Sequence, residues 1–196
     1  MVFNRDMLDH RIIDNIKIQD NFLDKNFFNN FKKILFGSDI DWYKTTVLPK
    51  NYDETCDGLS DDLKKSLIIS KCDSKHNVQL VHMFYSDDSP NSVYYHDYIK
   101  PIVKIMKVRS LIRIKANLNL ITEKNIKGGY HVDNIHDESF TSILYFNTCN
   151  GWTEFIEGPK VRTIENRLVT FPTCYYHSGV TCTDQESRVV INFNYF

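Results

Sequence analysis

The 196-residue sequence lacks the marks of membrane, secreted and nucleic-acid-binding proteins. No stretch approaches about 18 consecutive apolar residues, so we expect no membrane-spanning segment. The N-terminus carries no apolar signal segment, and the five cysteines include no C-x-x-C pair, which predicts reduced thiols in the cytoplasm. Lys and Arg number 24 against 25 Asp and Glu and form no long run, so no strong nucleic-acid signal is present.

What remains is the composition of an ordinary globular protein. Hydrophobic residues make up 42% and charged residues 25%, and no internal repeat or low-complexity tract interrupts the chain. The aromatic content of 13% favours a β-rich core. A chain of this length is typical of one domain with a substantial core, so we predict a single domain over residues 1–196.

The N-terminal half reads as helices and strands in alternation. Asp24 is a suitable N-cap for a helix with an apolar stripe from Phe27 to Leu35, and Gly37 is placed to end it. Ser92 is placed to cap a second helix, which Pro101 should kink or divide. The buried side of this helix is predicted to carry Tyr95, Tyr98, Ile99, Ile102, Ile105 and Met106. Further elements are predicted as an edge strand before 20, strands at 42–48 and 77–85, and a short helix at 62–69.

The C-terminal half is a series of short strands. Residues 111–121 alternate strictly between apolar and polar, and the polar face meets either solvent or a cavity in which Asn117 or Asn119 could hydrogen-bond a ligand. Asn150-Gly151 predicts a tight hairpin that returns 152–156 onto the strand before it. The regular spacing of strands is typical of a barrel or sandwich. The predicted strands are 111–121, 140–147, 152–156, 167–171, 179–182 and 188–196.

Three residues have the types and spacing of a metal site. His131 and Asp133 are two apart, so both side chains can lean to one side of an extended backbone, and His177 follows 46 positions later. Two imidazoles and one carboxylate suit non-haem Fe(II), because they occupy one face of the ion and leave positions open. Arg188 lies eleven residues after His177, far enough to face the same cavity from the next strand. A guanidinium there is a good receiver for a carboxylate.

Competing interpretations exist for these residues. The run His136-Asp137-Glu138 is itself an H-x-E, but its polar surroundings predict an exposed loop. His10, His76, His82 and His96 have no partner at metal-ligand spacing and are expected at the surface or in the core. Arg188 could pair with a nearby surface acid, Asp184 or Glu186. However, Arg188 begins an alternating strand and shares one face of it with Val190, Asn192 and Asn194. On the inward face of a barrel, an arginine needs an anion as its partner.

The pattern of His131, Asp133, His177 and Arg188 resembles the 2-oxoglutarate- and Fe(II)-dependent oxygenases, within them the prolyl-hydroxylase-like branch. The resemblance covers residues 112–196. It implies a mainly β fold with flanking helices, a double-stranded β-helix of the jelly-roll or cupin-like type. Residues 111–196 would form the catalytic barrel core and residues 1–110 a helical and strand support region.

The resemblance also implies roles for individual residues. His131, Asp133 and His177 would hold Fe(II) and act in catalysis, while Arg188 and Asn119 would bind the cosubstrate 2-oxoglutarate. Ascorbate is a further candidate cofactor. The segment from Gly151 to Phe155 is similar to the family's G-G-T-x-F, with Trp152 in place of a glycine and expected to narrow or cover the pocket.

The implied activity is hydroxylation of an unactivated C–H bond with O2, releasing succinate and CO2. Asp133 favours hydroxylation over halogenation, since family halogenases lack that carboxylate. The substrate would be a peptide, a protein or a small molecule, with a prolyl residue as the leading candidate. Two other classes stay open: a cupin-like module that binds a metal or small ligand without turnover, and a metal-dependent hydrolase.

Overall fold

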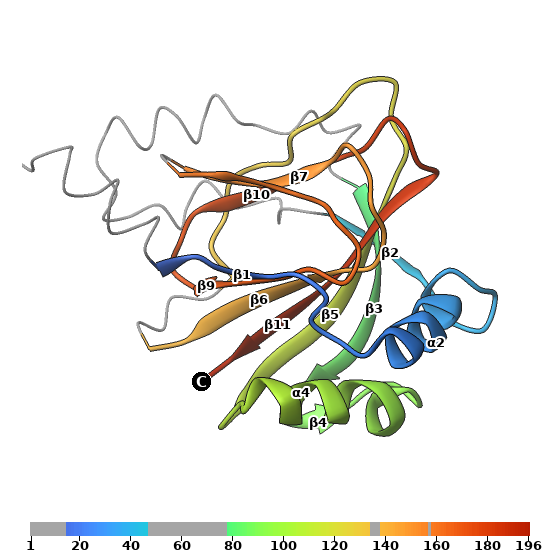
Figure 1. Ribbon diagram of the computed structural model, residues 1–196, viewed down its shortest axis with the longest axis vertical. Helices are drawn as coiled ribbons and strands as arrows, with labels where there is room; N and C mark the ends of the chain where they lie inside the picture. The colour runs from blue at the N-terminus through green and yellow to red at the C-terminus, as the bar shows by residue number, and fades with distance from the viewer. Residues whose placement is uncertain (1–14, 47–77, 134–137, 157) are drawn as a thin grey trace, which may run out of the picture.

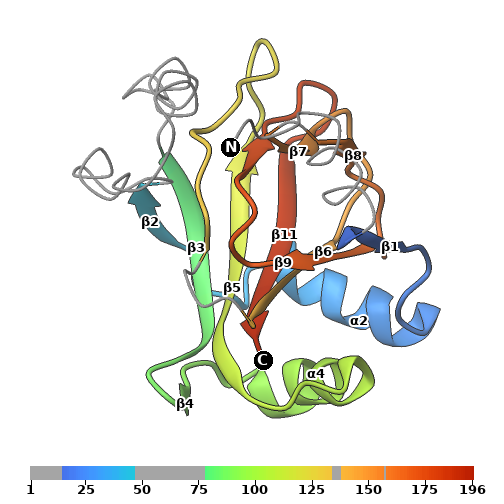
Figure 2. The same cartoon turned by 90° about the vertical axis from the view of Figure 1, so that its left-hand side faces the viewer.

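The computed structural model describes residues 15–46, 78–133, 138–156 and 158–196, which form two antiparallel β-sheets with helices against one of them (Figures 1 and 2). Outside these ranges lie the helix predicted at 62–69, three of the seven histidines (His10, His76 and His136) and, with His136, most of the competing H-x-E run. Within the described part of the chain, no helix is both long enough and apolar enough to cross a membrane. The elements in chain order are β1 (Lys17–Gln19), α2 (Lys25–Leu35), β2 (Tyr43–Thr46), β3 (Val78–Ser86), β4 (Ser89–Pro90), η2 (Tyr95–Ile99), α4 (Lys100–Met106), β5 (Leu111–Leu120), β6 (Phe140–Tyr145), β7 (Trp152–Phe155), β8 (Lys160–Arg162), β9 (Leu168–Pro172), β10 (His177–Val180) and β11 (Ser187–Tyr195).

The strands wind between the two sheets in the manner of a jelly roll. The large sheet has the order β1-β9-β6-β11-β5-β3-β2, with β4 paired to β3, and the small sheet has the order β10-β7-β8. From β6 onward the chain passes from the large sheet to the small one, back through β9, across to β10 and back again to β11. This confirms the predicted double-stranded β-helix.

The predicted hairpin at Asn150-Gly151 is wrong. Strand β7 pairs with β10 and β8 and not with β6, so the turn carries the chain from one sheet to the other. A two-residue type I′ turn requires positive φ at both central residues, and neither Asn150 nor Gly151 adopts it. The dipeptide is compatible with a hairpin but does not impose one.

Helix α2 forms as its sequence predicts. The Asp24 carboxylate accepts hydrogen bonds from the backbone N–H groups of Asn26 and Phe27, which caps the helix. The buried side of the helix carries Phe28 and Phe31, and these pack against the outer face of the large sheet. The ring centroid of Phe31 lies 5.1 Å from that of Phe146, at the end of β6.

The second helical segment divides near Pro101, as expected. Residues of η2 form one wide turn, and α4 begins with Pro101 in its first turn, where the missing N–H is tolerated. Ile99 and Ile102 are buried against the sheet, but Ile105, predicted on the same side, is 53% exposed. The prediction for Ile105 is wrong: α4 ends one residue later, at Met106, where Lys107 adopts the left-handed conformation and turns the chain out of the helix.

Strand β5 separates the two interiors of the molecule. Its apolar residues Ile114 and Ala116 are buried with the helices on the outer face of the large sheet. Its polar residues line a cavity between the two sheets rather than meeting bulk solvent, so the second of the two interpretations of this strand is the correct one. The polar residues of β5 that line the cavity are Arg113, Lys115, Asn117 and Asn119.

Candidate metal and cosubstrate site

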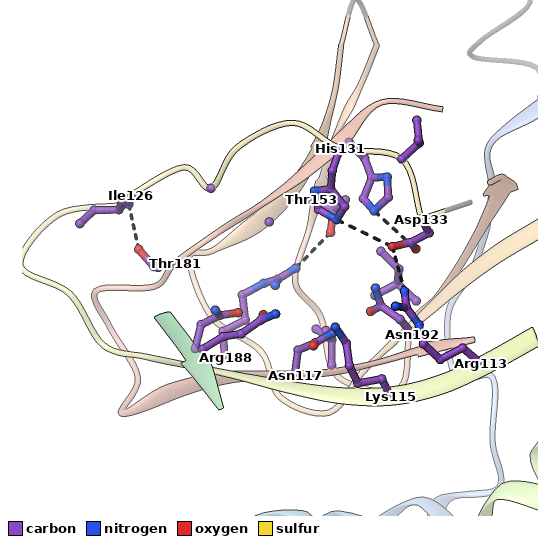
Figure 3. A pocket seen from close by; sticks show the side chains of 18 residues that line it. Arg113, Lys115, Asn117, Ile126, His131, Asp133, Thr153, Thr181, Arg188 and Asn192 are labelled. Carbon is purple, nitrogen blue, oxygen red and sulfur yellow. Dashed lines mark hydrogen bonds and ion pairs between the residues drawn. The ribbon is translucent and has the colours of Figure 1, made fainter. Parts of the chain in front are cut away.

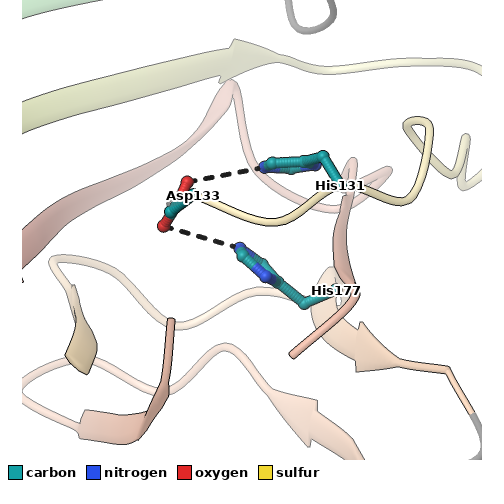
Figure 4. Close-up of side chains that lie close together, drawn as sticks. All are labelled: His131, Asp133 and His177. Atoms are coloured by element: carbon teal, nitrogen blue, oxygen red, sulfur yellow. Dashed lines mark ion pairs between the residues drawn. The ribbon is translucent and has the colours of Figure 1, made fainter. Parts of the chain in front are cut away.

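Two histidines distant in sequence are placed side by side by the backbone. The N–H of each donates to the C=O of the other, at 3.0 Å in both directions, which joins the segment before Asp133 to strand β10. The ring centroids of His131 and His177 are 4.6 Å apart. Figure 4 shows both rings pointing toward Asp133.

Backbone carbonyls fix which ring nitrogen faces the centre of the site. Nδ1 of His131 lies 3.1 Å from the Gly129 oxygen, and Nδ1 of His177 lies 3.0 Å from the Tyr175 oxygen. A carbonyl oxygen can only accept, so each Nδ1 carries the hydrogen and each Nε2 keeps its lone pair. Both lone pairs are therefore available to a metal ion.

Asp133 completes the group. Its Oδ1 lies 3.8 Å from Nε2 of His131 and its Oδ2 3.8 Å from Nε2 of His177, and one donor atom from each residue lies within 4.8 Å of the others. Two donors that bind one ion at about 2.1 Å are at most about 4.2 Å apart, so the measured 3.8 Å is compatible with a shared cation. Oδ2 also accepts hydrogen bonds from Thr141 and Asn194, each at 3.1 Å.

The electrostatics favour the metal-binding protonation states. Burial, together with the neighbouring His177, lowers the pKa of His131 to about 4, so this ring is neutral near pH 7. Burial by itself would raise the pKa of Asp133, but the two histidines, Arg113 and the Asn194 hydrogen bond hold it well below its usual range. The buried Nε2 of His177 has no hydrogen-bond partner in the described part of the chain. An orphaned lone pair beside an ionised carboxylate fits a bound cation.

Arg188 is buried at the other end of the same cavity. It is 3% exposed, and its Nε and NH2 donate to Thr163 Oγ1 at 2.8 Å and Thr153 Oγ1 at 3.0 Å. Among the described residues, no carboxylate pairs with it, and Asp184 instead accepts from the N–H of Asn150. The surface ion pair weighed for Arg188 is therefore not formed, and a buried guanidinium without a counter-ion can receive an anion.

The cavity measures about 280 Å³ and contains both the metal-binding group and Arg188 (Figure 3). Asn119 lines it on β5, directly opposite Arg188 on β11 in the sheet register. The side chains of His131, Asp133, His177, Arg188 and Asn119 are thus gathered around one space, as the sequence pattern predicts. Binding of a cosubstrate by Asn119 stays a prediction.

Several residues of the site escaped the sequence pattern. Thr153 and Thr163 orient Arg188, and the hydroxyl of Tyr145 donates to Thr153 at 2.7 Å. Thr153 stands in the segment similar to G-G-T-x-F, which was a usable signal. Thr163 and Tyr145 carried no signal, because Thr163 follows β8 in the small sheet and Tyr145 ends β6 in the large sheet, and their contacts with Arg188 and Thr153 join segments that belong to different sheets.

Trp152 does not narrow or cover the pocket. Alternation along β7 turns Thr153 toward the cavity and Trp152 toward the opposite face. There its Nε1 donates to Glu154 at 3.0 Å and Lys160 stands 5.1 Å from the ring centroid. His82, expected to be an ordinary core or surface residue, is satisfied by contacts with Asp41 and Ser92.

No protein-family model matches the sequence, and no curated protein matches it either. Solved structures do match over nearly the whole chain. A prolyl hydroxylase from Trichoplax adhaerens, in complex with a hypoxia inducible factor peptide fragment, is 14% identical with a TM-score of 0.59, over 98% of this chain and 90% of that one.

Two other similar structures extend the comparison. A 2OG-Fe(II) oxygenase family oxidoreductase from Burkholderia pseudomallei is 9% identical with a TM-score of 0.61, over 100% of this chain and 92% of that one. The non-heme alpha ketoglutarate dependent epimerase of nogalamycin biosynthesis is 11% identical with a TM-score of 0.57, over 98% of this chain and 82% of that one. The chain therefore has the double-stranded β-helix fold that the 2-oxoglutarate- and Fe(II)-dependent oxygenases share, prolyl hydroxylases among them.

Proposed function

We propose that this protein is a 2-oxoglutarate- and Fe(II)-dependent dioxygenase that hydroxylates an unactivated C–H bond and releases succinate and CO2. One observation carries the proposal: two lone-pair nitrogens and a carboxylate converge in the same cavity as a buried arginine that has no counter-ion. His131, Asp133 and His177 would hold Fe(II). Arg188 would pair with the distal carboxylate of 2-oxoglutarate, with Asn119 as a second contact.

The metal and its cosubstrate supply the oxidative chemistry, and the protein supplies geometry. The Gly129 and Tyr175 carbonyls hold the two imidazoles in one tautomer. Thr153 and Thr163 hold the guanidinium of Arg188 in one orientation before any anion arrives. Because these groups are ordered in advance, little reorganisation is needed when the ligands bind.

A prolyl residue of a peptide or protein is the candidate substrate that the resemblance supplies, and it agrees with the similar structure from Trichoplax adhaerens, a prolyl hydroxylase with a peptide bound. The fold does not choose the reaction, because one of the similar structures is an epimerase. Ascorbate as a cofactor and the cytoplasm as the location remain predictions.

Arg188 argues against the hydrolase, and against a module that binds a metal alone; a module that also binds a small anion without turnover is separated by the assay below. A hydrolase built on the same ligands needs no buried guanidinium at the far end of the cavity, and a module that binds only a metal does not need one either. The residue is 3% exposed, and burying an unpaired cation costs free energy that a bound carboxylate would offset.

One experiment separates the three classes. Anaerobic addition of Fe(II) and 2-oxoglutarate should produce a visible metal-to-ligand charge-transfer band, and air should then produce succinate. A protein with His131→Ala should give neither signal, while retaining the thermal unfolding of a folded chain. Absence of the band, together with no succinate under air, would reject the oxygenase.

A further inference from the structure

The cavity carries more positive charge than a metal and 2-oxoglutarate can balance. Three cationic side chains line it, Arg113, Lys115 and Arg188, against the single carboxylate of Asp133. A divalent ion and the dianion of 2-oxoglutarate cancel each other, so two positive charges are left over. Unbalanced charge inside a protein is costly, which points to a further anion in this space.

Of these three cations, Lys115 is the one whose charge has no polar partner among the described residues. It makes no hydrogen bond or ion pair in the described part of the chain, whereas Arg113 contacts Asn194 at 3.2 Å and Asp133 at 3.6 Å. Burial and the charge of Arg113 lower the pKa of Lys115 to about 8, as expected for an ammonium without a counter-ion. Figure 3 shows Lys115 on the cavity floor between Arg188 and Arg113.

Lys115 is also too far from Arg188 along the sheet to bind the same carboxylate group. In the sheet register Arg188 pairs with Asn119 and Lys115 pairs with Asn192, so four residues of β5 separate the two positions. Four residues of strand span roughly 13 Å. The distal carboxylate of 2-oxoglutarate, once on Arg188, leaves Lys115 for another anion.

Two amide oxygens in the cavity wall require hydrogen-bond donors. Oδ1 of Asn117 and Oδ1 of Asn192 are buried without a partner in the described chain, and both residues line the cavity next to Lys115. A buried acceptor left unsatisfied costs about 1–3 kcal/mol. The dianion of 2-oxoglutarate has no N–H or O–H to offer, so the donor is either water or a second ligand that displaces water.

We propose that the prime substrate is a free amino acid, with its carboxylate on Lys115 beside Arg113 and its ammonium group against Asn117 and Asn192. The proposal rests on the dioxygenase function proposed above, and it replaces the prolyl residue of a peptide or protein by a free amino acid as the substrate class. A zwitterion meets both demands, since it brings an anion to the unpaired cation and N–H donors to the unpaired oxygens. The cavity of about 280 Å³ also has to hold the metal and 2-oxoglutarate, so the space that remains suits only a small molecule.

The test compares each acid with its own amide. The full chain is loaded with Zn(II) in place of Fe(II) and with saturating 2-oxoglutarate, then titrated with the 20 common L-amino acids and their primary amides. Binding is followed by the rise in Tm, since a ligand that binds the folded state stabilises it. We expect at least one acid to bind, at least about tenfold more tightly than its amide. If no acid exceeds its amide in this way, the proposal is overturned.

Variants of Lys115 test whether this residue binds the carboxylate of the amino acid. Lys115→Gln should weaken the amino acid at least about tenfold, leave 2-oxoglutarate affinity within about twofold, and be rescued in part by Lys115→Arg. The opposite pattern, loss of 2-oxoglutarate affinity with unchanged amino acid affinity, assigns Lys115 to the cosubstrate and overturns the proposal. The Fe(II) charge-transfer band keeps the two hypotheses apart. Without the band the oxygenase fails, and with the band but no preference for acids only the substrate class fails.

Discussion

The two histidines of the site owe their orientation to backbone carbonyls, and Asp133 owes its orientation to side chains. Asn194 is one of these side-chain partners. It is 1% exposed, and its Nδ2 lies 3.1 Å from Asp133 Oδ2 and 3.0 Å from Thr141 Oγ1. Groups that orient a ligand carboxylate typically change metal affinity about 10- to 100-fold when removed. Metal binding should therefore depend on a residue that is not itself a ligand.

Asn194→Ala should lower metal affinity by about 10- to 100-fold because the Asp133 carboxylate loses a donor. Competition with a chelator measures the change. The matched control is Asn147→Ala, since Asn147 is also a buried asparagine but bonds only backbone groups near Ser187 and Val189. Equal metal affinities in the two variants would contradict the role given to Asn194.

Arg188→Ala should chiefly raise the 2-oxoglutarate requirement. Loss of a charge-assisted pair is worth about 1.5–3 kcal/mol, which corresponds to roughly 10- to 100-fold in the concentration needed. Succinate release at varied 2-oxoglutarate measures the effect. Arg167→Ala is the control, since Arg167 pairs with exposed Asp20 outside the cavity. An unchanged requirement in Arg188→Ala would contradict the cosubstrate role.

At the scale of elements, the crossing from β6 to β7 brings the two sheets together at Arg188. A Cβ on Gly151 would lie 2.7 Å from the Val180 carbonyl oxygen and 2.9 Å from Cδ of Arg188. Real side chains do not approach so closely, so only glycine allows β7, β10 and β11 to meet at this point. The connection between sheets is therefore part of the end of the cavity that contains Arg188.

Gly151→Ala should displace Arg188 and raise the 2-oxoglutarate requirement about tenfold, along with a loss of stability of about 1–3 kcal/mol from overpacking. Gly37→Ala is a matched control. Its Cβ would meet the Lys33 carbonyl at 2.8 Å, a comparable clash at the end of α2, so it should lower stability without changing that requirement. The same kinetic change in both variants would show that lost stability, not Arg188, is responsible.

At the scale of the whole molecule, the large sheet divides two different interiors. Helices and aromatic rings, among them Phe31 and Phe84, fill the outer side, whereas the inner side combines an apolar cluster around Phe155 and Phe171 with the buried polar cavity. Ionisable groups are thus buried between the sheets without an equivalent environment in the unfolded chain. Stability should therefore depend on pH.

The metal-free protein should lose stability as pH falls from about 6.5 to about 4. Burial lowers the pKa of His131 from 6.5 to about 4, so in this window the unfolded chain binds a proton that the folded chain does not. The difference corresponds to at most about 3 kcal/mol at about 1.4 kcal/mol per pKa unit. Above about pH 6.5 the contribution is constant. Asp133, with its lowered pKa, adds a further loss at more acidic pH.

Urea unfolding of the metal-free protein at steps of pH measures this dependence. His131→Gln removes the titrating group, so the slope between pH 6.5 and 4 should be flatter in the variant. Identical slopes in the two proteins would mean that His131 does not carry the effect.

Much of the fold followed from local pattern. The Asp24 cap and the apolar stripe predicted α2, and strict alternation predicted β5 and the shared face of β11, because these features depend only on near neighbours in the chain. The residue types and spacing of His131, Asp133 and His177 likewise indicated a metal site before any contact was known.

Only the tertiary structure decided what each face meets. The alternation of apolar and polar residues predicts that Arg113 and Lys115 share one face of β5. Only the closure of the two sheets makes that face the wall of a cavity. The same closure sent β7 away from β6 and set Thr153 against Arg188. Such contacts join strands far apart in sequence, and local pattern specifies the side on which a residue lies without specifying which strand lies opposite.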